Sequence, residues 1–313
     1  MRKRTSMGIS GILNVDKPYG ITSMELVRRV KRASHQKRVG HTGTLDPIAT
    51  GVLPICLGQA TRMMEYLVDD IKIYRTVVEL GVNTDTYDAL GKMTSRTESV
   101  NFSRAEVTDA LMKFKDINFQ VPPMFSALKK EGKRLYDLAR AGIEVERKPR
   151  SVEVFDLSLI DWEPPLVKFD VTCGRGFYVR SLAYDLGVEL KCGGHLKNLV
   201  RLKSGPFHQT DSVPLEEIEK GFKDDDWMDF IYNPDHALYK MKAAIVSGHT
   251  EKMIRDGRIL NQKFGMAGGI TEEKLRVYTE DGRFIGIIIF DSIIKSWRPH
   301  KVFSFDYLQP NMP

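Results

Sequence analysis

Two stretches in which every second residue suits a buried position constrain the fold more than any other feature of this chain. They cover residues 72–80 (KIYRTVVEL) and 167–173 (VKFDVTC). Successive side chains of a β-strand point to opposite faces, so each stretch predicts a strand with one buried face. The residues expected on the buried faces are Tyr74, Thr76, Val78 and Leu80 in the first strand, and Val167, Phe169, Val171 and Cys173 in the second.

Helices are expected between and around these strands. Residues 22–25 (TSME) and 103–106 (SRAE) both fit the capping box, in which a hydroxyl and a carboxylate satisfy the first free amides of a helix. Two further helices are predicted over 135–140 and over 177–186, the second ended by Gly187. No internal repeat is present, and the mixture of strands and helices predicts an α+β fold.

The remaining segments indicate how the chain is divided. Residues 120–150 look like an insertion, because the breaker Pro122-Pro123 opens them. Polar and acidic residues at 220–235 mark a boundary. We therefore predict a larger domain, residues 1–235, and a small β-rich domain, residues 236–313. In the smaller domain, strands are expected over 274–279 and 284–290.

Positive charge is clustered along the chain. The 47 Lys and Arg against 41 Asp and Glu give a net charge of +6 and a pI near 9.0. Such clusters favour a nucleic-acid partner, because each cation near a phosphate displaces a condensed counterion; the alternative is solvated helix faces. The clusters are Arg28, Arg29, Lys31, Arg32, Lys37 and Arg38; Lys129, Lys130, Lys133, Arg134, Arg140, Arg147, Lys148 and Arg150; and Lys191, Lys197, Arg201 and Lys203.

Composition narrows the class of protein further. Hydrophobic residues make up 42% and charged residues 28% of the 313 positions, which is ordinary for a globular chain and excludes a collagen-like or disordered one. The three widely spaced cysteines, Cys56, Cys173 and Cys192, are typical of reduced thiols in a cytosol. The longest apolar run, residues 284–290, is far too short to span a bilayer. We expect a soluble, cytoplasmic protein.

The stretch 39–51 (VGHTGTLDPIATG) carries the most chemical information. It belongs to a glycine-rich loop that is expected to run over residues 40–58. Glycines allow a close approach of the backbone to a ligand. Pro47 pushes Asp46 into an extended conformation, which leaves a stiffly posed carboxylate near the His41 imidazole. The alternative is structural, since Asp followed by Pro also begins many helices.

Several motifs in a fixed order accompany this stretch and cover nearly the whole chain. They are Asn14-Val15-Asp16-Lys17-Pro18 with Gly20-Ile21-Thr22-Ser23; Gly40–Gly51 continuing to Pro54-Ile55-Cys56; Lys72-Ile73-Tyr74 leading to Gly81, Thr84, Asp85 and Asp88; Pro122–Lys129 with Arg134-Leu135-Tyr136; Gly176–Arg180; Gly194-His195-Leu196; and Ser204–Phe207. On these motifs the sequence resembles the TruB-type tRNA pseudouridine synthases, which isomerise one uridine in the T-loop of tRNA, at position 55. Each motif alone is weak, but their order and spacing together are specific.

The resemblance implies roles for individual residues. Asp46 matches the catalytic aspartate, the nucleophile, Tyr74 the aromatic residue that stacks on the flipped uracil, and Arg180 the arginine paired with that aspartate. Leu199 matches an apolar wall of the pocket. The positions that match substrate-contacting residues are Tyr178 and His41, the second of which helps to hold the T-loop open in the family.

The chemistry fits these roles. The reaction exchanges a C–N glycosidic bond for a C–C bond on the same base, without net redox change or hydrolysis. We therefore expect no cofactor, and the sequence has no metal-ligand spacing of Cys and His. A cation such as Arg180 beside Asp46 would keep the acid ionised. A stacked base is out of reach, so the enzyme must extrude it at a cost of a few kcal/mol.

The resemblance also assigns the insertion and the tail. Residues 120–150 match the family's thumb, a mobile insertion that closes on the T-arm of tRNA. The tail from about residue 236 resembles a PUA domain, a small RNA-binding β-barrel that contacts the acceptor end. The implied fold is a mixed, largely antiparallel sheet with flanking helices, a thumb and a C-terminal β-barrel. The implied partner is tRNA, with no membrane and no obligatory protein. The thumb residues expected on the RNA backbone are Lys129, Lys130, Lys133 and Arg134.

Other hypotheses stay open at this point. A non-catalytic RNA-binding or RNA-folding protein would keep the same scaffold, and a guide-RNA-directed synthase is a close relative of the stand-alone form. An aspartate-nucleophile phosphatase is disfavoured, because Asp46 lacks the second acid two residues later. We expect structural roles for Lys17 and His195. Two departures from the family pattern are Val200, where many relatives carry Arg, and Phe125, where Tyr is common.

Overall fold

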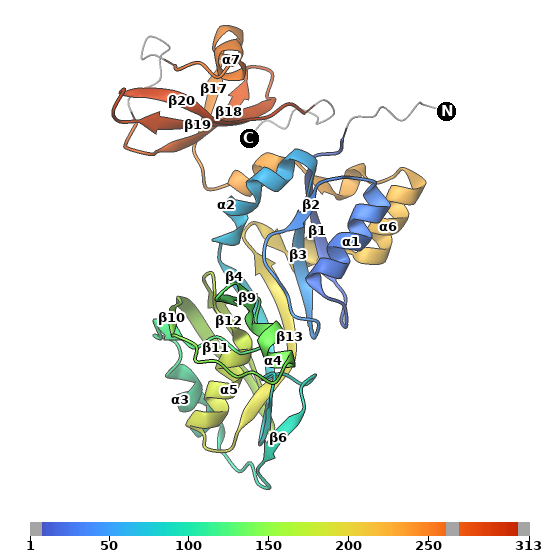
Figure 1. Ribbon diagram of the computed structural model, residues 1–313, viewed down its shortest axis with the longest axis vertical. Helices are drawn as coiled ribbons and strands as arrows, with labels where there is room; N and C mark the ends of the chain where they lie inside the picture. Colours follow the sequence, from blue (N-terminus) through green and yellow to red (C-terminus); the bar gives the residue numbers. More distant parts are fainter. Residues whose placement is uncertain (1–7, 261–268, 306–313) are drawn as a thin grey trace.

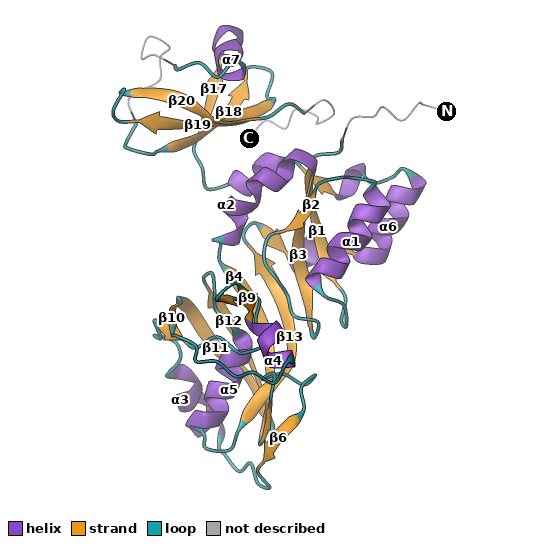
Figure 2. Ribbon diagram, in the orientation of Figure 1, coloured by secondary structure: helices purple, strands orange, loops and turns teal. Residues whose placement is uncertain are grey.

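A large mixed sheet forms the centre of the protein, for which the computed structural model describes residues 8–260 and 269–305 (Figures 1 and 2). In spatial order it contains β11 (Val154–Glu163), β12 (Leu166–Cys173), β4 (Lys72–Leu80), β13 (Gly194–Ser204), β3 (Ala49–Leu57), β1 (Gly11–Lys17) and β15 (Val213–Pro214), with β14 (Phe207–His208) beside β13, β16 (Ile231–Tyr232) beside β1 and β2 (Val39–His41) beside β3. Only the β13–β3 and β1–β15 pairs are parallel, so the predicted largely antiparallel mixed sheet is confirmed.

The two strands predicted from alternation are β4 and β12, and they are hydrogen-bonded neighbours. Tyr74 on β4 lies opposite Val171 on β12. In both strands the residues expected to face the core are buried, and those between them are more exposed. The alternation therefore identified both the strands and their buried faces correctly.

Four helices cover one face of the sheet. They are α1 (Ser23–Ser34), α3 (Arg104–Met112), α5 (Val179–Glu189) and α6 (Leu215–Asp224). Their apolar side chains join alternate residues of the strands in one core, to which β3 contributes Leu53 and Ile55, while Val52 and Cys56 of the same strand point into a second core on the opposite face. In Figure 1, α1 lies beside α6 and α3 lies beside α5, as two pairs over different parts of the sheet.

The helix starts agree with the predicted capping signals. Ser103 and Glu106 form the reciprocal capping box at α3, and the Thr22 hydroxyl accepts a hydrogen bond of 3.0 Å from the Glu25 amide at α1. The prediction that Gly187 ends a helix is wrong, because α5 continues to Glu189. A Cβ atom at Gly187 would lie 2.1 Å from the backbone nitrogen of Gly194. This glycine therefore permits close packing of α5 against β13 and does not terminate the helix.

The prediction of one long loop over residues 40–58 is also wrong. Most of this segment belongs to β2 and β3, and the connection between the two strands covers only residues 42–48. Residues 51–57 of β3 are buried on both faces of the sheet, which explains why a continuous apolar run forms a strand here. Gly51 has a φ of +92°, and a Cβ atom there would lie 2.4 Å from the carbonyl oxygen of Arg201. The absence of a side chain at Gly51 therefore allows β3 and β13 to lie close together.

The insertion over 120–150 holds a short helix, as predicted. β7 (Phe119–Gln120) pairs with β10 (Arg150–Ser151) at its base, and β8 (Lys129–Lys130) and β9 (Lys133–Arg134) form a hairpin that leads into α4 (Leu135–Arg140). A separate hairpin of β5 (Val82–Thr84) and β6 (Met93–Arg96) follows β4.

The tail forms its own sheet. Its strands are β17 (Ala243–Val246), β18 (Lys274–Thr279), β19 (Phe284–Asp291) and β20 (Ser296–Val302), with α7 (Gly248–Arg255) packed against them. The predicted strands at 274–279 and 284–290 are confirmed, while closure into a barrel stays a prediction. Phe284 and Phe303 share the second core with Val52 and Cys56 of β3, so the tail packs on the sheet face opposite the four helices.

Further contacts tie the tail to α2 (Met64–Val68) and the turn before it. Lys301 pairs with Glu65, and the Arg62 guanidinium donates to the carbonyl oxygen of Val302 over 2.8 Å. Within the described ranges, every helix is too short or too polar to cross a lipid bilayer.

Candidate active site

Asp46 lies in the turn between β2 and β3, and its neighbours hold that turn firmly. The Leu45 amide donates to the Ser23 hydroxyl, which donates in turn to the Leu45 carbonyl, both over 2.8 Å. The Ala49 amide donates to the Asp46 carbonyl over 3.0 Å. The structural alternative, in which Asp46 begins a helix, is wrong, because β3 follows the turn. The Asp46 carboxylate instead faces Arg180, and its side chain is 30% exposed.

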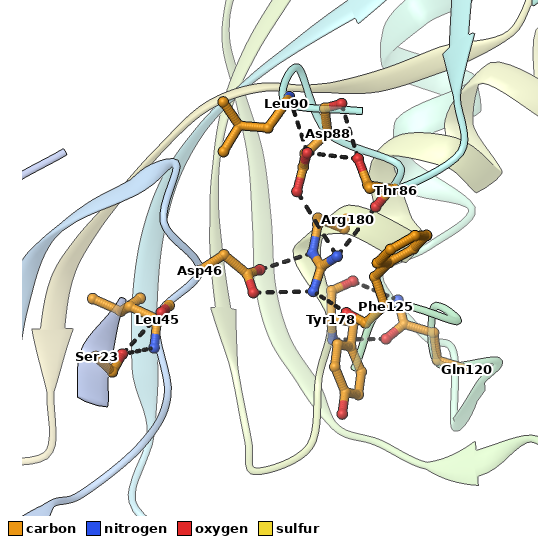
Figure 3. A network of polar contacts seen from close by, with 10 residues as sticks. All are labelled: Ser23, Leu45, Asp46, Thr86, Asp88, Leu90, Gln120, Phe125, Tyr178 and Arg180. Atoms are coloured by element: carbon orange, nitrogen blue, oxygen red, sulfur yellow. Dashed lines mark hydrogen bonds and ion pairs between the residues drawn. The ribbon is translucent and has the colours of Figure 1, made fainter. Parts of the chain in front are cut away.

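Arg180, in the first turn of α5, contacts both oxygens of Asp46 (Figure 3). Its Nε lies 2.8 Å from Oδ2, and its Nη2 donates to Oδ1 over 3.0 Å. The contact combines one charge-assisted hydrogen bond, donated by Nη2, with a close ion pair at Nε. The arginine side chain is only 6% exposed, so the alternative of a surface cation is wrong.

The remaining nitrogen donors of Arg180 point to backbone carbonyls. Nη1 donates to Thr86 over 3.1 Å, and Nη2 donates to Phe125 over 2.8 Å. Phe125 belongs to the insertion and Thr86 to the loop after β5 (Figure 3). The same guanidinium therefore joins Asp46, the insertion and this loop.

A second acid, Asp88, completes the surroundings of Arg180. Its Oδ2 lies 3.8 Å from Nη1 of Arg180, while its Oδ1 accepts hydrogen bonds from the Thr86 hydroxyl at 2.7 Å and the Leu90 amide at 3.1 Å. Burial raises the pKa of Asp88, and the hydrogen bond from Thr86 and the charge of Arg180 oppose that rise. The sequence motif contained Asp88, but nothing in its spacing indicated this contact.

Tyr178 is fixed at the start of α5 by the base of the insertion. The Gln120 side chain accepts from the Tyr178 amide over 2.8 Å and donates to the Tyr178 carbonyl over 3.0 Å. Gln120 is buried and lies on β7. Burial raises the pKa of the Tyr178 phenol, and the charge of Arg180 opposes that rise. Gln120 of the insertion thus fixes the backbone of Tyr178, two residues before Arg180 of α5.

Tyr74 and Leu199 approach the same pair from the sheet. Tyr74 lies on β4 directly opposite Arg201 on β13, and Leu199 lies opposite Ala49, which begins β3 just after Asp46. Tyr74 and Leu199 are both buried. Burial raises the pKa of the Tyr74 phenol, the neighbouring charge of Arg201 lowers it, and the charge of Asp46 raises it.

Arg201 does not fit the prediction from charge clustering, in which clustered cations face a nucleic acid or solvent. It was grouped with exposed cations on sequence distance, but it is 1% exposed. Its Nε donates to the Val52 carbonyl over 2.6 Å and its Nη2 to the Gly43 carbonyl over 3.3 Å. Its place on the central strand β13 accounts for the burial, and no feature of the single sequence reveals it.

His41 and Lys17 each bond to a residue that flanks Asp46 in the chain. The Gly43 amide donates to Nδ1 of His41 over 3.3 Å, and burial together with the charge of Arg201 lowers the pKa of that imidazole. Lys17 is fully buried and donates to the carbonyls of Pro18 at 3.0 Å and Ala49 at 2.7 Å. Burial lowers the pKa of Lys17 to about 8. These bonds agree with the structural role expected for Lys17.

The four thumb cations occupy the β8–β9 hairpin, where Lys129, Lys133 and Arg134 are exposed and Lys130 is half-buried. Lys130 donates to the Glu146 carbonyl over 3.1 Å, and Arg134 donates to the Tyr136 hydroxyl over 2.8 Å. In the described part of the chain, no hydrogen bond or ion pair joins any of the four to Asp46 or Arg180. The structure therefore joins Asp46 to Arg180, and the segments next to this pair carry His41, Tyr74, Tyr178 and Leu199, whereas the β8–β9 hairpin carries Lys129, Lys130, Lys133 and Arg134.

In chemical terms, the site offers one partly open carboxylate beside a buried guanidinium, with apolar and aromatic side chains around it. Such a carboxylate can act as a nucleophile, and its contacts with the guanidinium fix its orientation. No group of three or more His, Cys, Asp or Glu within residues 8–260 and 269–305 is arranged to hold a metal ion. His195, expected to be structural, has its Nδ1 3.0 Å from the Val82 carbonyl.

Comparisons with known proteins agree on one family. Residues 31–179 match the model of the TruB family pseudouridylate synthase N-terminal domain, and residues 180–238 match the tRNA pseudouridylate synthase B C-terminal domain. The tRNA pseudouridine synthase B of Clostridium novyi (strain NT) is 42% identical over 279 residues, which cover 89% of this chain and 95% of the relative. That of Dehalococcoides mccartyi (strain ATCC BAA-2266 / KCTC 15142 / 195) is 40% identical over 295 residues, 94% of this chain and 97% of the relative.

Solved structures show the same fold. A Cbf5–Nop10–Gar1 complex contains a chain that superposes with a TM-score of 0.72 at 23% identity, over 94% of this chain and 85% of that one. An H/ACA RNP bound to a substrate RNA gives a TM-score of 0.71 at 21% identity, with the same coverage of 94% and 85%. These likenesses confirm the expected α+β architecture.

Proposed function

Because the chain belongs to the TruB family of pseudouridylate synthases, we propose that it modifies the uridine at position 55 in the T-loop of tRNA, with Asp46 as the nucleophile. As a member of that family it is a tRNA pseudouridine synthase, an isomerase that converts uridine to pseudouridine. The observation that supports the assignment of Asp46 is its paired contact with the buried Arg180, at 2.8 and 3.0 Å.

The reaction needs one nucleophile and no net co-reactant. The glycosidic bond between the sugar C1′ and N1 breaks, a bond from C1′ to C5 forms, the proton on C5 is lost and N1 gains one. Asp46 attacks either the sugar carbon or the pyrimidine ring, and the same carboxylate serves both routes. Arg180 holds that carboxylate in a fixed orientation, and its own backbone partners Thr86 and Phe125 keep the guanidinium in place.

The groups around the pair suit a flipped base. Tyr74 supplies an aromatic face that replaces part of the stacking lost when the base leaves the loop. Leu199 forms an apolar wall, and Tyr178 and His41 contact the substrate. The burial of Tyr74 and Leu199 beside the Asp46 turn supports these roles, because an apolar surrounding excludes water from a covalent intermediate.

The binding of tRNA involves parts of the chain outside the site. We assign residues 1–235 to the catalytic domain and residues 236–313 to a PUA-like RNA-binding domain. The thumb cations Lys129, Lys130, Lys133 and Arg134 neutralise phosphates and position the RNA without reading its sequence. Their exposed position on a projecting hairpin supports this role.

The test uses unmodified tRNA labelled with tritium at C5 of uracil. We expect the protein to release tritium, and a transcript with cytidine at position 55 to release none. The Asp46→Asn variant should bind tRNA almost as well as the wild type and release no tritium, since it loses the nucleophile and keeps the phosphate contacts. Turnover by Asp46→Asn would refute the mechanism. Binding without any release by the wild-type protein would support the non-catalytic alternative.

A further inference from the structure

Arg201 is a buried charge that the proposed chemistry does not use. It is one of the two largest side chains that are fully buried in the described residues, together with Lys17. No carboxylate of the described chain lies within 4.0 Å of it, in contrast to Arg180. A buried guanidinium without a counter-ion costs several kcal/mol unless its hydrogen bonds are satisfied, so an apolar side chain would serve stability alone better. This cost indicates that the contacts of Arg201 have a role other than stability.

Those contacts enclose the Asp46 turn. The two acceptors, Gly43 and Val52, lie on the two arms of the chain that flank Asp46, one before it and one after it. The Arg201 side chain on β13 therefore bonds to the chain both before and after Asp46. At the same position of β13, its backbone lies against Gly51, where a side chain would collide with it.

On its other side, Arg201 faces Tyr74. The two residues are direct cross-strand partners on β13 and β4, so their side chains leave the sheet on the same face. The Arg201 guanidinium thus links the turn that carries the Asp46 carboxylate to the strand that carries the Tyr74 ring.

We propose that Arg201 is a positioning residue that sets the Asp46 carboxylate against the Tyr74 ring, so that a flipped uracil stacked on Tyr74 lies in line for attack. The inference rests on the proposed function of Asp46 and Tyr74. Arg201 itself acts through these two residues and does not contact the atoms that react. Its planar fork of donors suits the task, because it can bond two carbonyl groups in fixed directions at once.

The test measures the chemical step separately from binding. In Arg201→Gln we expect the single-turnover rate of tritium release at saturating enzyme to fall by about 100-fold, the order of loss that a misplacement of about 1 Å causes, while tRNA affinity stays within about 2-fold. Arg201→Lys, which keeps the charge and loses the fork, should fall between this variant and the wild type. The matched control is Arg75→Gln, an arginine of β4 that is 45% exposed and paired with Asp170; it should react at the wild-type rate.

A second readout does not depend on activity. With 3-fluorotyrosine at position 74, the fluorine NMR signal reports the titration of that phenol in the free protein. Arg201→Gln should move this titration to higher pH, because the neighbouring positive charge is lost. A folded Arg201→Gln with the wild-type rate would overturn the inference whatever the titration shows, and an unmoved titration would refute the contact between Arg201 and Tyr74. If Arg201→Gln does not fold, Arg201→Lys decides by the same rate and affinity measurements: a wild-type rate overturns the inference, and a slow rate with intact affinity supports it.

The failure of this inference differs from a failure of the proposed function. An active Asp46→Asn variant refutes the nucleophile, whatever Arg201 does. An inactive Asp46→Asn together with a fully active Arg201→Gln refutes only the positioning role.

Discussion

Asp88 contacts Arg180 through a different nitrogen from those that hold Asp46, with Oδ2 3.8 Å from Nη1. The buried guanidinium therefore lies between two carboxylates. The second one, Asp88, is buried, balances the charge of Arg180 and accepts a hydrogen bond from the Thr86 hydroxyl over 2.7 Å.

We expect Asp88→Asn to slow tritium release by about 10-fold, because removal of one partner from a buried charged network costs roughly 1 to 3 kcal/mol. Asp88→Ala should be slower still, since it also removes the acceptor for the Leu90 amide. Initial rates at saturating tRNA, with the unfolding temperature as a control for folding, measure the effect. Equal activity of Asp88→Ala and the wild type would contradict the role.

Tyr74 tests whether stacking dominates recognition of the base. Tyr74→Phe keeps the aromatic face, so tRNA affinity should stay close to that of the wild type, while Tyr74→Ala should lose about 1 to 3 kcal/mol of binding. Filter binding with unmodified tRNA distinguishes the variants. If Tyr74→Phe bound as poorly as Tyr74→Ala, the hydroxyl and not the ring face would be the main contribution.

The thumb cations test the electrostatic part of binding. Reversal of Lys129, Lys130 and Lys133 to Glu should weaken tRNA binding and reduce its dependence on salt, because fewer counterions are released from the RNA. Binding constants over a range of salt concentrations give the slope. The control Lys113→Glu alters an exposed lysine directly after α3 that pairs with Glu189. An unchanged slope in the triple variant would mean that the hairpin faces away from RNA.

Lys17 predicts a pH dependence of stability. The ordinary pKa of 10.5 falls to about 8 in the folded protein, chiefly because of burial. Between pH 8 and 10.5 the unfolded chain therefore binds more protons, and the free energy of unfolding gains up to about 1.4 kcal/mol per pH unit from this group as pH rises. Below pH 8 the full cost of the buried charge is present.

Comparison with Lys17→Met isolates this contribution, because all other groups titrate alike in both proteins. The difference in free energy of unfolding between wild type and Lys17→Met should shift in favour of the wild type from pH 8 to pH 10. Denaturant titrations at several pH values measure it, and Lys31→Met controls for loss of an exposed lysine. A difference that is constant with pH would show that Lys17 is not buried in its charged form.

Gly187 tests the packing of α5 on β13. Gly187→Ala should destabilise the protein by about 3 kcal/mol or more, because the new methyl group would lie 2.1 Å from the Gly194 nitrogen and backbone on both sides would have to move. Gly248→Ala, at the start of α7, meets no atom within 4 Å and is the matched control. Thermal unfolding of both variants checks the prediction, and equal stability would contradict the close packing.

Local patterns predicted the helices α1, α3, α4 and α5 and the strands β4, β12, β18 and β19. The alternation in 72–80 and 167–173 and the capping residues Thr22 and Ser103 act over a few neighbouring residues, so a single sequence displays them. The stretch around Asp46 left its role open, and the chemistry was implied by the family resemblance, which rests on several motifs in a fixed order along the chain.

Burial and long-range partners were decided only by the tertiary structure. Arg201 looked like one of several surface cations, and Gly187 looked like a helix end, until β13 lay in the middle of the sheet with α5 against it. The pairing of Asp46 with Arg180 joins residues that are 134 positions apart. A sequence read alone therefore determined which groups the protein possesses and which short segments are regular. The packing of distant segments decides which of these groups become buried and come into contact, because exposure and contact are properties of the folded chain.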